Sequence, residues 1–382
     1  MGAMQDGAST YPLFHWGPIP WSFYIILAVS FGFMLHVRKR NKQKYSEACR
    51  PLLGGRVDGL WGKLIDLTAV FALLAGTATT FSLATPLLSM ALSRVLGISE
   101  NNFLTIGILV IICVVYTMAV YFGMQGIAKL AASCVYLFFG LLAYFLLCGG
   151  ETRYIIETGI TAVGNMVQNF VGMATWTDAT RTSSFPQNWT IFYWAYWMVW
   201  CVATISKGRT IRQTVLGGYF FGLSGTFTSF IILGNYGLGL QMHGKLDLMG
   251  VYAGTGDLYQ AIISIFETMP LAKAGLVLLA ITMIAFYATS FDALTMVASS
   301  YSYKSLGAEE EPHKQVKLFW SILLMLLPIA LIFAENSMAN LQTVSIIAAF
   351  PIGFIIVMIV WSFFKDARHY LDKENSETQN IR

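Results

Sequence analysis

The residues of this chain with the most distinctive chemistry are aromatic and lie within 188–200. Four of them share one face of a helix, at the spacing i, i+4, i+8 and i+11: Trp189, Tyr193, Trp197 and Trp200. Ring faces carry a negative quadrupole that attracts a cation. A trimethylammonium group has no N–H donor, so carboxylates and carbonyls cannot hydrogen-bond to it, whereas stacked rings can hold it. The stripe therefore favours a buried site for a quaternary amine. An aromatic belt at a membrane surface is the alternative.

A second aromatic group lies near the beginning of the chain and contains Trp16, Trp21 and Tyr24. Taken alone, it is typical of an anchor at a membrane interface. The Trp-rich run at 188–200 is the more specific signal, because it continues through about three helical turns where a belt needs about one.

Ionisable groups in or near apolar runs are few: Asp66, Lys129, Asp292 and Glu335. Asp292 lies deepest, and both a structural and a functional carboxylate remain open for it. No HExxH, GxSxG, phosphate-binding loop or carboxylate pair accompanies these groups. The five cysteines have no CxxC spacing and the five histidines are scattered. The sequence thus predicts neither catalysis nor a metal centre.

Composition sets the class of protein. Apolar residues make up 56% of the 382 residues and charged residues 12%, and the mean hydropathy is +0.62. A soluble globule could not hide so much apolar surface. The net charge of +4 is too small and dispersed for nucleic-acid binding. We therefore expect an all-α, polytopic helical membrane protein.

Apolar runs long enough to cross a bilayer predict nine spans: 18–36, 62–92, 102–124, 128–150, 189–206, 211–236, 271–300, 316–336 and 338–364. The runs 152–174 and 256–268 are broken by charges and predict helices at the interface. The loop after the first span is rich in Lys and Arg, which places it in the cytoplasm. Counting onward puts the amino terminus outside and the carboxyl terminus inside.

Two spans have unusual features. The run 191–205 is 15 residues long and reaches about 22 Å, short of a hydrocarbon core of about 30 Å. A short or broken span indicates a midplane transport site, and a deletion is the alternative. Gly218 and Gly222 have the small-xxx-small spacing that lets two helices approach closely.

Several stretches together resemble the betaine/choline/carnitine transporter (BCCT) family. They read FHWGPIPW at 14–21, SLATPL at 82–87, FPQ at 185–187, NWTIFYWAYW at 188–197 and ISKGRT at 205–210. The stretches at 82–87 and 185–187 are closest to the carnitine-transporting branch. The resemblance covers nearly the whole chain.

The resemblance implies an inverted-repeat, LeuT-like core of ten helices that two further helices precede. The nine spans correspond to that set without its first three helices, so we expect the chain to be truncated at its amino terminus. One membrane domain, 1–382, would then divide into the remainder of the first repeat (18–150), an external amphipathic helix and loop (151–188), the second repeat (189–364) and a cytoplasmic tail (365–382).

The resemblance also implies the substrate site. Aromatic-box or pathway positions are matched by Trp16, Trp21, Tyr24, Trp197 and Trp200. Tyr196 stands where carnitine carriers place another tryptophan, and an access-side position is matched by Trp189 and Tyr193.

A sodium-site segment of the sodium-coupled members is matched by Phe286, Thr289 and Ser290. Hydroxyl and carbonyl oxygens suit a hard cation. The sodium-independent exchangers carry an arginine at the position of Val135, so this chain favours ion coupling, with Na⁺ as the expected ion and no organic cofactor.

The expected function is secondary active transport of carnitine, glycine betaine, γ-butyrobetaine or choline across a bacterial cytoplasmic membrane, by alternating access. Family resemblance implies a homotrimer. A truncated, transport-inactive remnant of such a carrier is the alternative, because of the missing helices and the short span. No catalytic pattern supports an enzyme.

Overall fold

The computed structural model describes residues 2–121, 124–175, 208–307, 310–333 and 338–381. These residues form helices joined by loops, and no strand occurs among them. In chain order the elements are α1 (Gly2–His15), α2 (Pro18–Gly32), η1 (Phe33–Val37), α3 (Tyr45–Ala48), α4 (Arg50–Leu53), η2 (Gly54–Asp58), α5 (Leu60–Leu96), α6 (Asn102–Tyr121), α7 (Met124–Cys148), α8 (Thr152–Thr175), α10 (Ile211–Ser229), η3 (Phe230–Gly234), α11 (Asn235–Met242), α12 (Leu248–Thr255), α13 (Leu258–Glu267), α14 (Ala272–Tyr301), α15 (Lys314–Phe333) and α16 (Met338–Ile381).

Eight of the nine predicted spans fall on these helices, and the ninth, 189–206, lies outside the described residues. Six helical stretches of the described chain are long and apolar enough to cross a membrane: Gln5–Val37, Leu60–Thr77, Ala131–Cys148, Ile211–Met242, Ala272–Tyr301 and Phe350–Glu377. The prediction of a multi-pass helical membrane protein is confirmed. The total number of spans and the absence of the family's first three helices stay predictions.

Two helices differ from the sequence expectation. The first predicted span begins at 18, yet residues 2–15 also form a helix, α1, which packs along α8. Leu13 and Phe14 of α1 are buried there against Ala162 and Met166 of α8. Tertiary packing therefore stabilises a helix that has a weak hydrophobic pattern. At the other end, α16 does not stop near 364 but continues to Ile381.

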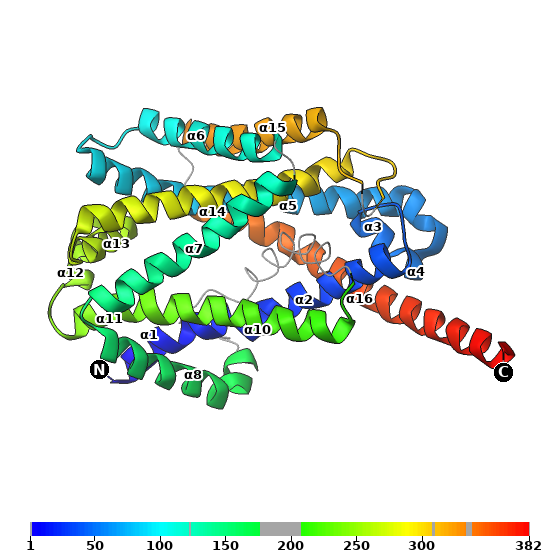
Figure 1. The fold of residues 1–382 in the computed structure, drawn as a ribbon, viewed down its shortest axis with the longest axis horizontal. Coiled ribbons are helices and arrows are strands. Elements are labelled where there is room, and N and C mark those ends of the chain that lie inside the picture. Colours follow the sequence, from blue (N-terminus) through cyan, green and yellow to red (C-terminus); the bar gives the residue numbers. More distant parts are fainter. Residues whose placement is uncertain (1, 122–123, 176–207, 308–309, 334–337, 382) are drawn as a thin grey trace.

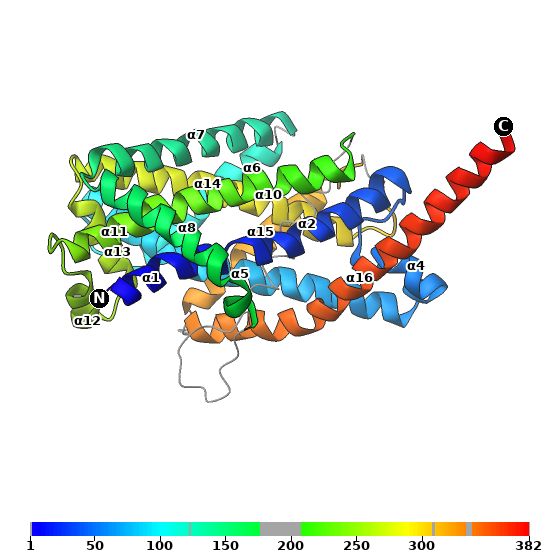
Figure 2. The same ribbon diagram turned by 90° about the horizontal axis from the view of Figure 1, so that it is seen from below.

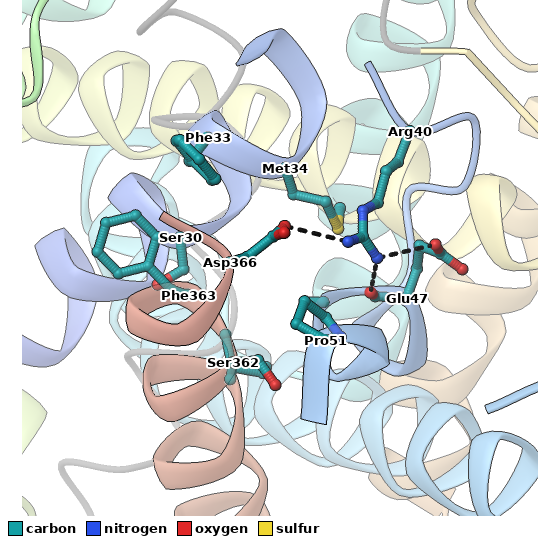
Figure 3. A pocket seen from close by; sticks show the side chains of 11 residues that line it. Ser30, Phe33, Met34, Arg40, Glu47, Pro51, Ser362, Phe363 and Asp366 are labelled. Carbon is teal, nitrogen blue, oxygen red and sulfur yellow. Dashed lines mark hydrogen bonds and ion pairs between the residues drawn. The ribbon is translucent and has the colours of Figure 1, made fainter. Parts of the chain in front are cut away.

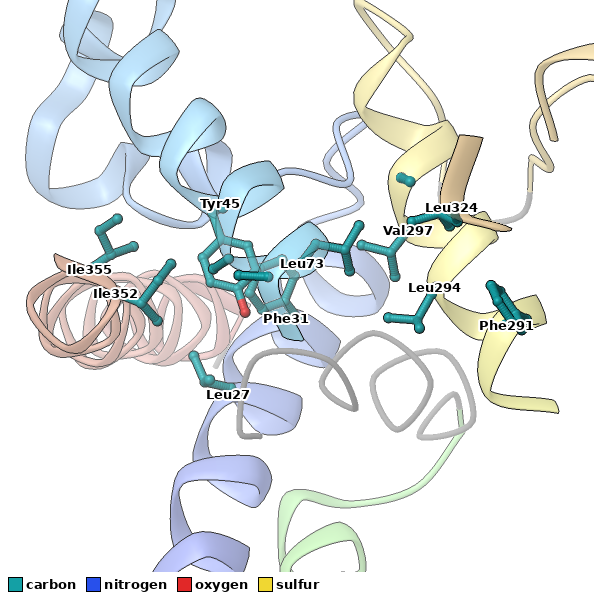
Figure 4. Packing of buried hydrophobic residues seen from close by; sticks show 14 of the residues in the cluster. Leu27, Phe31, Tyr45, Leu73, Phe291, Leu294, Val297, Leu324, Ile352 and Ile355 are labelled. Atoms are coloured by element: carbon teal, nitrogen blue, oxygen red, sulfur yellow. The ribbon is translucent and has the colours of Figure 1, made fainter. Parts of the chain in front are cut away.

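The main hydrophobic core lies where α5 packs against both α14 and α16 (Figure 1). Its buried side chains come mainly from α2, α3, α5, α6, α14, α15 and α16 and from η1. Figure 4 labels ten of them: Leu27, Phe31, Tyr45, Leu73, Phe291, Leu294, Val297, Leu324, Ile352 and Ile355. A second cluster joins α7, α11 and α13 around Phe145 and Tyr236. The two chain ends lie at opposite ends of the long axis (Figures 1 and 2). Helix α16 projects beyond the body of the molecule at the carboxyl end.

A buried ion cluster fixes α16 to the loop that follows η1 (Figure 3). Arg40 Nη2 donates to Asp366 Oδ2 at 3.0 Å, and its Nη1 donates to Glu47 Oε1 at 3.3 Å. Arg38 Nε lies 3.3 Å from Asp366 Oδ1. The side chains of Arg40, Glu47 and Asp366 are 16%, 7% and 9% exposed. The cluster thus ties the first described helices to the last one through charge-assisted hydrogen bonds.

A second ion cluster lies at the opposite end of the molecule and joins α8 to the end of α11. Glu151 is 3% exposed. Lys245 Nζ lies 2.6 Å from its Oε1, and His243 Nδ1 lies 2.8 Å from its Oε2. The ring of Tyr154 packs edge-on against His243. Burial raises the pKa of Glu151, but the hydrogen bonds from Lys245 and His243 outweigh burial, so the pKa of this carboxyl is lowered.

Acid should weaken this second cluster. A carboxyl whose folded-state pKa is lowered contributes stability above its ordinary pKa of about 4.3 and loses it as pH falls through the lowered value. We expect the melting temperature of the detergent-solubilised protein to drop from pH 5 to pH 3, and to drop less in Glu151→Gln. Glu157→Gln, which removes a surface carboxylate that pairs with Arg153, should leave the acid-dependent drop as it is. An equal drop in melting temperature in the native protein and in Glu151→Gln would contradict the role of Glu151 in this acid sensitivity.

Candidate functional site

The first membrane-spanning stretch is broken in its middle, between α1 and α2. Helix α1 ends at His15, and α2 begins at Pro18 after Gly17, whose backbone angles (φ −90°, ψ −136°) are not helical. A Cβ at Gly17 would lie 2.1 Å from the carbonyl oxygen of Leu13, so no other residue fits without a shift of the backbone. Proline has no N–H and suits the first turn of α2, where no intrahelical partner is needed. The sequence itself therefore encodes the break.

Trp16 lies at the break between α1 and α2 and contacts Phe230, the first residue of η3. Its ring stacks on Phe230 with the ring centroids 6.5 Å apart and an interplanar angle of 23°. On its own side, His15 packs edge-on against it at 5.7 Å. Trp16 is thus positioned between the end of α1 and the beginning of η3.

Trp21 lies on the first turn of α2 and is fixed by three contacts. Its Nε1 donates to Thr226 Oγ1 at 3.1 Å. Its ring meets the edge of Tyr24 at 5.1 Å between centroids. Its indole face covers Gly222, where a Cβ would lie 2.5 Å from Cε3 and Cζ3 of the ring. Gly222 therefore creates the space that Trp21 occupies on α10.

The helix that faces the break is itself irregular. Residues 211–242 form one continuous rod in which η3 is a π-helical turn between α10 and α11. π-Helical turns inside α-helices are frequent at functional sites. A buried hydrogen bond of 2.7 Å from Ser9 Oγ to Asn235 Oδ1 fixes α1 to the rod next to this turn. The break and the π-turn therefore lie at the same interface.

This interface carries three of the predicted substrate-site residues in two groups: Trp16 stacks on Phe230, and Trp21 packs against Tyr24. Tyr24 is buried, and the two tryptophans are half-buried. Aromatic side chains on a broken membrane helix can offer ring faces to a cation at the depth of the bilayer. The arrangement is chemically suited to bind a methylated cation and has no feature of a catalytic site.

The family model for the betaine/carnitine/choline family transporters matches residues 2–372. The chain belongs to this family. A carnitine transporter of Acinetobacter baumannii is 26% identical over 386 residues, which cover 97% of this chain and 70% of that protein. A solved structure of a Na⁺-coupled sialic acid symporter, substrate-bound and outward-open, has a TM-score of 0.41 and 15% identity over 94% of this chain and 77% of that chain. The protein is thus a multi-pass transporter and not an enzyme.

The sodium segment predicted from the BCCT resemblance lies on α14 and packs against α7. Phe286 and Phe138 have ring centroids 6.0 Å apart, and Cys134 Sγ lies 4.0 Å from Thr289 Oγ1. The Thr289 hydroxyl donates to the carbonyl of Phe286 at 2.9 Å. Ser290 is half-buried. These contacts are with α7, next to Val135, whereas the aromatic contacts at the break are with α10 and η3.

The remaining predicted BCCT site residues lie outside the described residues: Trp189, Tyr193, Tyr196, Trp197 and Trp200. The same holds for the short span at 191–205. The carnitine-branch stretch at 82–87 lies within α5, and its Thr85 Oγ1 lies 3.3 Å from the phenol oxygen of Tyr287 in the interface of α5 and α14. Both side chains are buried. That motif therefore connects α5 to the helix of the predicted sodium segment.

Sequence reasoning missed the residues that position the aromatic group at the break. Tyr219, which bonds Ser22 at 2.6 Å between hydroxyl oxygens, and Thr226 and Phe230 carry no motif. The available signal was the spacing of Gly218 and Gly222. It correctly predicted close helix packing: a Cβ at Gly218 would lie 3.0 Å from Ile25. The spacing did not say which helix, or which aromatic side chain, fills the space.

Three hollows bounded by described residues lie away from the predicted substrate site. One lies beside the Arg40–Asp366 ion cluster (Figure 3), and one lies between the end of α5 and the beginning of α13, beside Arg94 and Asp257. The third is an apolar groove between α2 and α16 that includes Trp361. None of these three is lined by a residue predicted for substrate or sodium.

Proposed function

We propose that this chain is a secondary transporter of a small trimethylammonium compound: carnitine, glycine betaine, γ-butyrobetaine or choline. Family membership and the similarity to a carnitine transporter support this class of substrate. The observation that carries the proposal is the set of aromatic contacts that follows the break between α1 and α2, in which Trp16 stacks on Phe230 and Trp21 packs against Tyr24. We infer that the predicted Trp-rich run of 188–200 completes the box.

The binding energetics follow from ring chemistry. Each ring face adds about 0.5–2 kcal/mol to the binding of a desolvated cation. Several rings can then offset the dehydration of a trimethylammonium group. The hydrogen bond to Thr226 fixes the Trp21 indole, and the edge contact with Tyr24 limits the rotation of the phenol. Less side-chain entropy is therefore lost when substrate binds.

The transport cycle would be alternating access around this site, with the broken helix and the π-turn as the flexible elements. We propose Na⁺ as the coupling ion, held by oxygens at Phe286, Thr289 and Ser290. We further propose that the protein resides in a bacterial cytoplasmic membrane with its carboxyl terminus inside, as a homotrimer.

Uptake into proteoliposomes tests the proposal. Labelled carnitine, γ-butyrobetaine, glycine betaine and choline are offered with and without a Na⁺ gradient. We expect saturable uptake of at least one of the four, faster with the gradient. Binding without uptake, measured by tryptophan fluorescence or calorimetry, would instead favour a transport-inactive remnant. Neither binding nor uptake of any of the four would refute the substrate class.

Trp21→Leu should weaken substrate binding about two- to thirtyfold, since one ring face is worth about 0.5–2 kcal/mol. Calorimetric titration of the substrate that proteoliposome uptake identifies measures the change. Trp361→Leu is the matched control, because Trp361 is 65% exposed on α16 and lies in the apolar groove. Equal affinities in Trp21→Leu and the native protein would remove Trp21 from the site.

A further inference from the structure

Helix α14 carries a buried polar stripe that the substrate site does not use. Asp292, Thr295 and Ser299 lie at i, i+3 and i+7 and therefore on one face of the helix. They are 5%, 0% and 0% exposed. Each has a side-chain oxygen without a hydrogen-bond partner within the described part of the chain: Asp292 Oδ1, Thr295 Oγ1 and Ser299 Oγ. The stripe extends over about 10 Å of the helix.

Other buried hydroxyls of the same helix are satisfied by its own backbone. Thr282 donates to the carbonyl of Leu278 at 2.7 Å, and Ser300 donates to that of Val297 at 2.7 Å. Thr295 and Ser299 could form such bonds in a helix but do not. Their oxygens are instead left to accept or donate elsewhere, which costs free energy unless a ligand or water is bound.

Among the described residues, none is a direct counter-ion of the Asp292 carboxylate. The charged groups whose fields reach it, among the described residues, are Lys317 and Glu311. Lys317 is 3% exposed, and its Nζ already pairs with Glu311 Oε2 at 2.9 Å. Buried apolar side chains alternate with the stripe along α14, as Phe291, Leu294 and Val297 in Figure 4 show. An unpaired carboxylate in such surroundings favours a bound cation or proton.

We propose that Asp292, Thr295 and Ser299 form a binding path for the monovalent coupling cation, Na⁺ or a proton. The path begins about one helical turn after Thr289 and Ser290 and follows the buried face toward the Tyr301 end of α14. Asp292 supplies the negative charge, and the two hydroxyls supply oxygen ligands for a hard cation or hydrogen bonds for a proton. This inference rests on the proposed transport function and assigns the groups that carry its coupling ion.

Asp292→Asn separates coupling from substrate binding. The variant keeps the shape of the side chain but has no negative charge to attract the cation. We expect ion-driven accumulation to fall at least tenfold, and the ratio of uptake with the cation gradient to uptake without it to fall toward one. Separate Na⁺ and pH gradients show which cation is used. Accumulation by Asp292→Asn at the native level would overturn the proposal.

Thermal unfolding without substrate supplies a test that does not depend on transport. Because Asp292 Oδ1 has no hydrogen-bond partner in the described part of the chain, Asp292→Asn should melt at the native temperature or above it. NaCl, compared with KCl, or a change of pH should shift the melting temperature of the native protein and shift that of Asp292→Asn less. A lower melting temperature with an unchanged response to Na⁺ and pH would assign Asp292 a structural role and overturn the proposal.

Two hydroxyl variants complete the design. Thr295→Val should reduce the response to the cation, because it removes an unpartnered oxygen of the stripe. Thr282→Val, which removes a hydroxyl already bonded to its own helix, should not. Equal effects of the two would also count against the path. If the native protein responds to the cation but neither binds nor moves any quaternary amine, the substrate proposal fails while the ion path stands.

Discussion

Gly222→Val is expected to remove most of the quaternary-amine binding of this BCCT protein. A Cβ at position 222 would lie 2.5–2.7 Å from Cε3, Cζ3 and Cδ2 of Trp21, closer than real Cβ contacts allow. The indole must then leave its place, break its hydrogen bond to Thr226 and move away from Tyr24. With two rings displaced at about 0.5–2 kcal/mol each, affinity should fall roughly fivefold to nearly a thousandfold. Calorimetric titration measures this change.

Stability should change in the same variant, because overpacking a helix interface costs about 1–3 kcal/mol. Gly217→Ala and Gly225→Ala are the matched controls on α10, since a Cβ at either position meets nothing within 4 Å. Both should keep native affinity and melt at or slightly above the native temperature, because alanine favours helix over glycine. The double variant Gly222→Ala, Trp21→Leu should lose less than the sum of its single losses. Strict additivity would show that the ring and the glycine are not coupled.

Arg40→Met should lower the free energy of unfolding by about 1.5–3 kcal/mol, because it removes charge-assisted hydrogen bonds from two buried carboxylates. Glu47 keeps its pair with Arg50, and Asp366 keeps its pair with Arg38. Arg40 is the residue that joins the two carboxylates, at 3.3 Å and 3.0 Å (Figure 3). Thermal or denaturant unfolding in detergent measures the loss. Adding Asp366→Leu to Arg40→Met should recover part of it, since the buried carboxylate that lost one of its two arginine partners is removed as well.

Arg153→Ala is the control for this second prediction. Arg153 pairs with Glu157 within one helix, and the two side chains are 88% and 63% exposed. A surface pair of this kind contributes about 0–1 kcal/mol. If Arg40→Met costs no more than Arg153→Ala, then packing of α16 against α5, and not the ion cluster, holds this helix in place.

The sequence predicted most of the helices because membrane spans leave a direct mark on composition: a run of about 20 apolar residues. It failed where other forces decide. Helix α1 has polar residues and forms because Leu13 and Phe14 bury themselves against α8. The π-turn η3 and the extension of α16 past 364 leave no hydropathy signal. The ion cluster joins residues more than 300 positions apart, which no local pattern reveals.

The candidate site was predictable in kind and less so in detail. Ring chemistry and family motifs led to Trp16, Trp21 and Tyr24, and the structure places them at one interface. Their partners Thr226 and Phe230 depend on how α2 packs against α10, which one sequence does not specify. Asp292 was left open between a structural and a functional role. That its Oδ1 has no hydrogen-bond partner among the described residues could be seen only once its neighbours were placed.

Helix α16 is long, and its carboxyl-terminal part extends beyond the other helices (Figure 1). The helix has 44 residues and measures about 66 Å, roughly twice the hydrocarbon thickness. Asp366 of this helix forms ion pairs with Arg38 and Arg40. The last 15 residues lie beyond Asp366 and extend about 22 Å. If α16 tilted by about 10° about Asp366, its carboxyl-terminal end would move by about 4 Å. A spectroscopic label at Glu377 would therefore report, as a measurable displacement, rearrangements of the membrane-embedded helices that are too small to follow directly.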